Sequence, residues 1–127
     1  MANQLNVLGN KLELCSSDPL TGFFRDGCCK NSEGDVGQHN VCAVVDERFL
    51  TFSKNEGNDL ITPRTEFQFP GLEPGDRWCL CQDRWYQAYK KGKAPKVIKT
   101  ASNSKIKQEY KDIILNKNKK KTIKGGS

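Results

Sequence analysis

The stretch Val41-Cys42-Ala43-Val44-Val45 decides the fold, because it is a continuous apolar run rich in β-branched residues. A short run of this kind predicts a strand that is buried on both faces. Asp46 follows directly and is suited to cap a helix, which we expect over residues 47–56. Gly57 is suited to the left-handed residue that ends such a helix.

A second strand and helix follow the same pattern further along the chain. Arg77-Trp78-Cys79-Leu80-Cys81 predicts another strand, after which Asp83 is suited to cap a helix that closes at Gly92. A last short strand is expected over residues 96–100, and near-helical spacing of apolar residues predicts a terminal helix over 106–115.

The segments around these units are rich in turn-forming residues. Residues 5–14 alternate loosely around a Gly-Asn pair, which predicts a short strand or hairpin. Residues 15–37 and 60–75 are rich in Gly and Pro, and they predict long ordered loops. The whole pattern predicts an α+β fold, a single small domain with a mostly antiparallel sheet, two to three helices and long ordered loops.

Charge divides the chain into two parts. Residues 1–89 carry eight Lys/Arg and thirteen Asp/Glu (8 − 13 = −5), whereas residues 90–127 carry thirteen Lys and two acids (13 − 2 = +11). We therefore expect one cysteine-rich domain over residues 1–115 and a flexible lysine-rich tail over 116–127. The tail lacks arginine and interleaved aromatic residues, so we do not expect nucleic-acid binding.

The N-terminus has no basic and apolar leader, and no apolar run is long enough to cross a bilayer. The expected location is therefore cytoplasmic, without a membrane segment. In a reducing compartment, the six cysteines are expected to be thiols or metal ligands rather than disulfides. The sequence leaves the partners and the oligomeric state open.

The cysteines form two local pairs that suit a thiophilic metal. Cys79 and Cys81 lie two apart on a predicted strand and therefore share a face, and Cys28 and Cys29 are adjacent. Four thiolates from two segments can hold a tetrahedral zinc ion, with His39, the only histidine, as a further candidate ligand. Cys15 and Cys42 can replace either pair, although Cys42 is expected in the core.

Two other interpretations of the cysteines stay open. In the first, the Cys79/Cys81 pair serves a thiol-dependent redox or transfer enzyme, with His39 or Arg77 favouring the thiolate. In the second, the cysteines are inert and packed in a structural or partner-binding domain, because free cysteine behaves as a small hydrophobe.

The ordered loops also carry polar residues that meet the strand bearing Cys79 and Cys81. Such residues often only bond the local backbone, but together they predict a binding pocket for a small ligand at the strand end. The candidate binding residues are Arg25, Asp26, Asn58, Asp59, Asp76, Arg77 and Trp78.

Several motifs, taken in order, resemble a known family. They are Asn6-Val7-Leu8-Gly9, the stretch from Thr21 to Cys29, Gly57-Asn58-Asp59-Leu60, Phe69-Pro70-Gly71-Leu72, and the stretch from Pro74 to Cys81 with Arg84-Trp85. In this order they resemble domain-of-unknown-function family 2237, over Asn6 to about Val97. The resemblance implies a single stand-alone domain without an assigned activity.

Overall fold

The computed structural model describes residues 4–67 and 69–116. The α-helices are α1 (Glu47–Asn55), α2 (Gln82–Lys90) and α3 (Gln108–Ile114), and the strands are β1 (Val41–Val44), β2 (Arg77–Leu80) and β3 (Lys96–Val97). Two short 3-10 turns, Thr65–Phe67 and Lys99–Ala101, complete the regular structure of the described residues.

The three strands form one sheet in the order β2-β1-β3, and both strand pairs are antiparallel. In the register of β1 and β2, Cys42 lies opposite Cys79 and Ala43 lies opposite Trp78. The chain is thus a small α+β domain with an antiparallel sheet and three helices, which confirms the predicted fold class.

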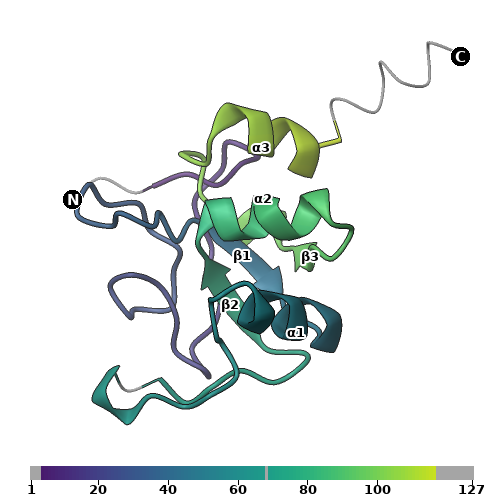
Figure 1. Cartoon of the computed structure of the whole chain (residues 1–127). Helices are drawn as coiled ribbons and strands as arrows, with labels where there is room; N and C mark the ends of the chain where they lie inside the picture. The colour runs from purple at the N-terminus through teal and green to yellow at the C-terminus, as the bar shows by residue number, and fades with distance from the viewer. Residues whose placement is uncertain (1–3, 68, 117–127) are drawn as a thin grey trace, which may run out of the picture.

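The two faces of the sheet pack against different material, because successive residues of a strand point to opposite sides. Val41, Ala43, Trp78 and Leu80 join the hydrophobic core with the helices. Cys42 and Cys79 instead join a second cluster with Cys15, Cys29 and Ala101 from outside the strands. Figure 1 shows the helices to one side of the strands and the loop-rich N-terminal segment to the other.

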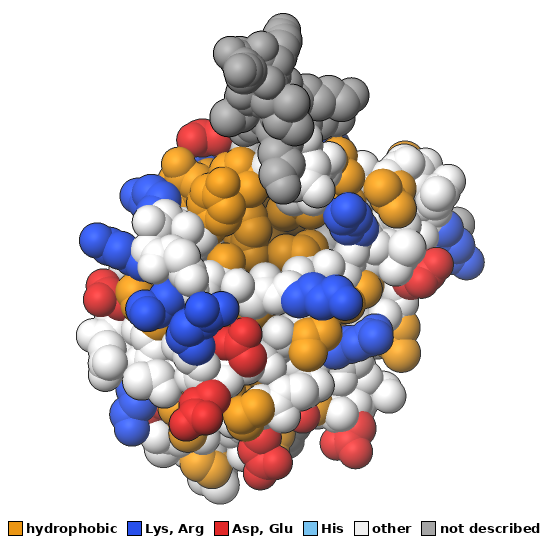
Figure 2. Space-filling view, turned by 90° about the vertical axis from the view of Figure 1, so that its right-hand side faces the viewer, with side chains coloured by type: hydrophobic (Ala, Val, Ile, Leu, Met, Phe, Trp, Pro, Cys, Tyr) orange, Lys and Arg blue, Asp and Glu red, His pale blue; other side chains and the backbone are white. Residues whose placement is uncertain are grey.

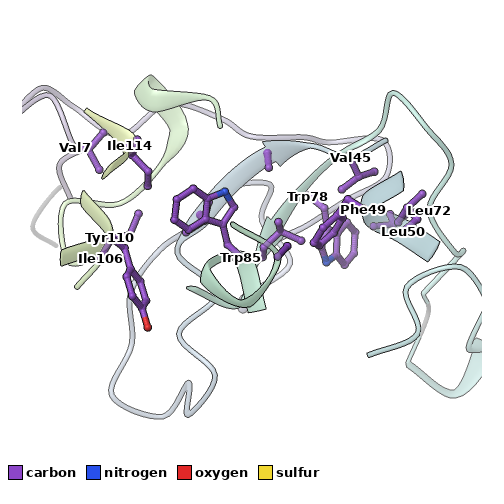
Figure 3. Packing of buried hydrophobic residues seen from close by; sticks show 14 of the residues in the cluster. Val7, Val45, Phe49, Leu50, Leu72, Trp78, Trp85, Ile106, Tyr110 and Ile114 are labelled. Atoms are coloured by element: carbon purple, nitrogen blue, oxygen red, sulfur yellow. The ribbon is translucent and has the colours of Figure 1, made fainter. Parts of the chain in front are cut away.

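The core on the helical side has two centres joined by Trp85. Phe49 of α1 packs near Trp78, while Tyr110 of α3 packs near Ile106 at the other end (Figure 3). These side chains are buried, and Phe49 is only 1% exposed. The helices thus cover this face of the sheet. The loops pack on the opposite face, which carries Cys42 and Cys79.

The helix boundaries follow the predicted signals in part. Asp46 caps α1 as expected, because its side chain accepts a hydrogen bond of 2.8 Å from the Phe49 amide. Helix α2 differs, since it starts one residue before the predicted cap Asp83 and its N-cap position is Cys81. This start places a free thiol at the first turn of a helix.

The predicted strand or hairpin over residues 5–14 forms as a hairpin-like turn without a regular strand. This segment forms only an isolated β-bridge between Leu5 and Lys11, and a second bridge joins Asn6 to Asn103. The Leu8 and Asn10 amides donate to the Asn6 side chain, and backbone hydrogen bonds from Asn6 to Asn10 and from Leu12 to Gln4 join the two arms of the turn. The predicted tail of residues 116–127 lies outside the described residues except for Asn116.

None of the helices in residues 4–67 and 69–116 is long and apolar enough to cross a membrane. Figure 2 shows a face on which Lys and Arg side chains alternate with Asp and Glu and surround a group of hydrophobic side chains. On this face the basic residues do not join into one continuous surface.

Candidate functional site

Four of the six cysteines are joined in two disulfides, Cys15–Cys42 and Cys29–Cys79. Cys28 and Cys81 are free thiols, as predicted. The other four cysteines form disulfides and correct the prediction. The prediction followed from the expected compartment, whereas the pairing follows from folding, which brings the loops over the two cysteines of the sheet.

The two disulfides lie side by side because Cys42 and Cys79 are partners across β1 and β2. Their backbone amides donate to side-chain hydroxyls, the Cys42 amide to Ser102 and the Cys79 amide to Thr21, each at 2.9 Å. These bonds fix the outer segments against the cysteine-bearing face. Three of the sulfurs, those of Cys15, Cys29 and Cys79, lie within 4.8 Å of one another and are buried, so this group could hold a metal ion.

The expected metal set of Cys28, Cys29, Cys79, Cys81 and His39 is brought together only in part. Cys29 and Cys79 are bonded to each other, while Cys28 and Cys81 are half-buried free thiols. Burial, and then the charge of nearby Asp26, raise the pKa of the Cys28 thiol. Cys28 is therefore a poor nucleophile at neutral pH.

A pocket of about 230 Å³ lies at the end of β2, where the chain enters α2. It is lined by Gly37, His39, Asn58, Leu60, Trp78, Cys79, Leu80, Cys81 and Arg84. The lining thus combines three segments that are distant in the sequence. One of the free thiols, Cys81, and the only histidine of the chain, His39, lie in the same pocket.

His39 is held from one side by Asp35. The Asp35 carboxylate accepts from the His39 amide and lies 2.8 Å from the ring nitrogen Nδ1. Because a carboxylate only accepts hydrogen bonds, Nδ1 carries the proton and Nε2 is the basic nitrogen. The Asp35 side chain is 2% exposed and the His39 side chain is 41% exposed, so the orienting group is buried while the imidazole stays accessible.

The turn that carries His39 is fastened to the start of α2, next to Cys81. The Gln82 amide donates to the Gln38 carbonyl oxygen at 3.1 Å, and the two side chains also share a hydrogen bond. Gly37 leaves room for the imidazole, because a Cβ atom at this position would lie 2.9 Å from Cε1 of His39. Backbone bonds and a missing side chain thus set where the ring stands relative to the thiol.

Of the seven predicted binding residues, Asn58 and Trp78 line the pocket. Arg25 is not among the lining residues but lies over Trp78, which is. Its guanidinium is 5.2 Å from the centre of the Trp78 ring, and its Nη1 donates to the Gly22 carbonyl oxygen. Asp26 forms an ion pair of 2.8 Å with Lys30.

The remaining predicted binding residues do not line the pocket. Asp59 accepts from the Ile61 and Thr62 amides, and bonds led by that of the Thr62 side chain lower the pKa of Asp59 to about 2. Asp76 accepts from the Glu73 amide, and Arg77 is exposed on β2. Their contacts in the structure are those of turns and a strand end.

Two residues that bear on the pocket were not among the predicted site residues: Asp35, which is paired with His39, and Arg84, which is part of the lining. Asp35 stands four residues before His39, a spacing at which its carboxylate reaches the imidazole across one turn of the chain. Arg84 stands three residues after Cys81, within the first turn of α2. Both spacings are visible in the sequence, but only the folded pocket shows that the two residues act at one place.

The family comparison covers this whole domain, including all six cysteines, His39 and Arg84. A search of curated proteins found no match. The profile of family DUF2237, described as uncharacterized protein conserved in bacteria, matches residues 5–119. This match confirms the resemblance seen in the sequence motifs. The chain belongs to the DUF2237 family.

Proposed function

We propose that this protein is a thiol-dependent enzyme in which the Cys81 sulfur attacks a small electrophilic substrate. One observation carries the proposal: the free thiol of Cys81 and the imidazole of His39, held by Asp35, line the same pocket. A nucleophile, a base and a group that orients the base are the parts that covalent thiol catalysis requires.

The residues divide the chemistry as follows. His39 takes the Cys81 proton at Nε2, and the Asp35 carboxylate stabilises the imidazolium that forms. The sulfur then bonds to the electrophilic carbon, and the leaving group departs with the electron pair and receives the proton from His39. Because Cys79 is bonded to Cys29, the nucleophile is Cys81 alone rather than a Cys79/Cys81 pair.

Alkylation of the unreduced full-length protein by iodoacetamide tests this assignment. The rate at each free thiol is read from peptides by mass spectrometry, with Cys28 as the reference in the same molecule. We expect Cys81 to react at least about tenfold faster than Cys28 at pH 7, and His39→Gln to remove most of this advantage. Asp35→Asn should slow Cys81 less, because the imidazole remains.

The matched control for His39→Gln is Val36→Ala, which changes a fully exposed residue of the same loop and keeps the imidazole. Circular dichroism and the urea midpoint establish that each variant is folded. Equal rates at both thiols, unchanged by His39→Gln, would contradict the proposed enzyme and favour packed, inert thiols.

Metal binding is a second candidate function, favoured by the three buried sulfurs within 4.8 Å of one another. A tetrahedral zinc site with bonds of about 2.3 Å needs sulfurs about 3.8 Å apart, so the bonded sulfurs of Cys29 and Cys79 must separate while the sulfur of Cys15 is already close to both. Cys42 is the fourth ligand in this proposal. Two molecules of a cellular dithiol, each oxidised to a disulfide, would together supply the four electrons and four protons that open the two disulfides, and zinc binding would release the protons again.

The reducing cytoplasm expected from the sequence suits this second candidate. Elemental analysis of protein purified under reducing conditions, without chelator and without a polyhistidine tag, tests it. We expect about one equivalent of zinc, lost when Cys15 and Cys42 are both changed to Ser. Less than about a tenth of an equivalent in the unchanged protein would exclude the metal site.

A further inference from the structure

The described wall of the pocket beside Cys81 contains an arginine and a histidine but no carboxylate. His39 and Arg84 line it, and within residues 4–67 and 69–116 no Asp or Glu does. Two acids lie close to these groups without lining the pocket: Asp35 is paired with the His39 ring, and the Glu56 carboxylate accepts a hydrogen bond from Gln87. Arg84 is therefore the one permanently charged side chain among the lining residues of the described chain.

The Arg84 guanidinium pairs with no carboxylate among the described residues. Its Nη1 atom donates to the Glu56 carbonyl oxygen at 3.0 Å and to Oε1 of Gln87 at 3.2 Å, and both acceptors are neutral. The ion pairs in the described part of the chain are Lys30–Asp26 and His39–Asp35, and neither includes Arg84. A guanidinium has five N–H donors in a planar fork, so donors remain for an anion.

We propose that the substrate of Cys81 is a small anionic electrophile whose carboxylate or similar oxyanion is bound by Arg84. The Asn58 amide is a further hydrogen-bonding group in the same wall. The volume of about 230 Å³ lies below the range of about 300–1,000 Å³ typical of drug-sized ligands. A small acid fits such a space, whereas a nucleotide or a peptide does not. This inference rests on the proposed thiol chemistry and adds the class of substrate to it.

Iodoacetate is a direct probe, because it is a small carboxylate with an electrophilic carbon. The Cys81 sulfur forms a bond to the CH₂ carbon, the carbon–iodine bond breaks, and iodide leaves with the electron pair. The thiol proton passes to His39 and then to solvent. Iodoacetamide undergoes the same reaction without the negative charge, so the ratio of the two rates isolates the effect of charge.

The experiment measures both rates at Cys81 in the unreduced full-length protein, with a short cysteine peptide in the same tube as reference. We expect the iodoacetate-to-iodoacetamide ratio at Cys81 to exceed that of the peptide by about tenfold, with a rate that saturates at high iodoacetate. Arg84→Gln should lower the ratio to that of the peptide. Arg77→Gln, a change at an exposed arginine outside the pocket, should leave the ratio unchanged.

Competing anions distinguish the two oxyanion classes. Protection of Cys81 by propionate but not by inorganic phosphate identifies a carboxylate site, and the reverse identifies a phosphate site. Arg84→Lys keeps the charge if Arg84→Gln folds poorly, and it should retain part of the preference. A ratio at Cys81 equal to that of the peptide, or one unchanged in Arg84→Gln, would overturn the inference. The dependence of the iodoacetamide rate on His39 judges the thiol chemistry separately.

Discussion

Cys28 and Cys81 are both free thiols, yet the charges around them have opposite sign. Cys28 stands beside Asp26, whose carboxylate also accepts a hydrogen bond of 3.0 Å from the Cys28 amide. Cys81 stands in a pocket with His39 and an arginine. The Asp26 charge opposes the Cys28 thiolate, whereas no Asp or Glu of the described residues lines the pocket of Cys81. This contrast underlies the difference in reactivity that we propose.

The Cys28 thiol provides a prediction with a definite sign. Its pKa is raised by burial and then by Asp26, so less thiolate is present at a given pH and alkylation shifts to higher pH. Asp26→Asn keeps the oxygen that accepts the Cys28 amide but removes the charge. We expect this variant to speed alkylation of Cys28 about two- to threefold at pH 8, measured against pH by peptide mass spectrometry.

Cys81 is the control for this prediction, because Asp26 does not line its pocket. Its rate should not change in Asp26→Asn. A Cys28 rate that stays the same or falls in the variant would show that the Asp26 charge does not oppose the thiolate.

The helices and the two main strands could be predicted from the sequence because their signals are local. The continuous apolar run of β1 and the Asp46 cap each involve only a few neighbouring residues. Asp83 shows where this reasoning stops: it was expected to cap α2, but its carboxylate accepts from the Tyr110 hydroxyl of α3 at 2.7 Å. The sequence predicts a cap because Asp83 stands at the start of a helical pattern. It gives no sign of a hydrogen-bond partner 27 residues away.

The Tyr110–Asp83 bond joins α2 to α3 and can be tested by its removal. Burial, and then the bond to Asp83, raise the pKa of Tyr110, so the hydroxyl stays protonated as the donor. Tyr110→Phe should lower the free energy of unfolding by about 1 kcal/mol, measured by urea denaturation. Tyr86→Phe is the matched control, because its bond of 3.1 Å to Glu109 is exposed and its loss should cost less than about 0.5 kcal/mol. Equal effects of the two changes would contradict a specific stabilising role for the Tyr110–Asp83 bond.

The whole molecule is a sheet with helices on one face and loops attached by sulfur to the other. The disulfides close segments of 27 and 50 residues, which restricts the unfolded chain and stabilises the fold by about 3–4 kcal/mol each. This attachment holds a long irregular segment in place, and the turn with His39 ends that segment. The pocket therefore depends on the loop layer as much as on the sheet.

The site could be predicted less well than the fold, because its parts come from segments that meet only after folding. The sequence indicated His39 and the end of β2 as a place for chemistry, and it indicated Asn58 and Trp78. It could not indicate which cysteine bonds to which, since adjacent Cys28 and Cys29 are equal candidates until the chain path is known. The choice between them decides which of Cys28 and Cys29 stays a free thiol.

The division of six cysteines into two disulfides and two free thiols is the claim on which the rest depends. Iodoacetamide treatment of the unreduced protein, followed by trypsin and mass spectrometry at acidic pH, tests it most directly. We expect peptide 12–25 linked to peptide 31–48 without alkylation, and peptide 26–30 linked to peptide 78–84 with two alkyl groups. Fragmentation should place those groups on Cys28 and Cys81. Six alkylated cysteines, or a link through either of those two, would contradict the account.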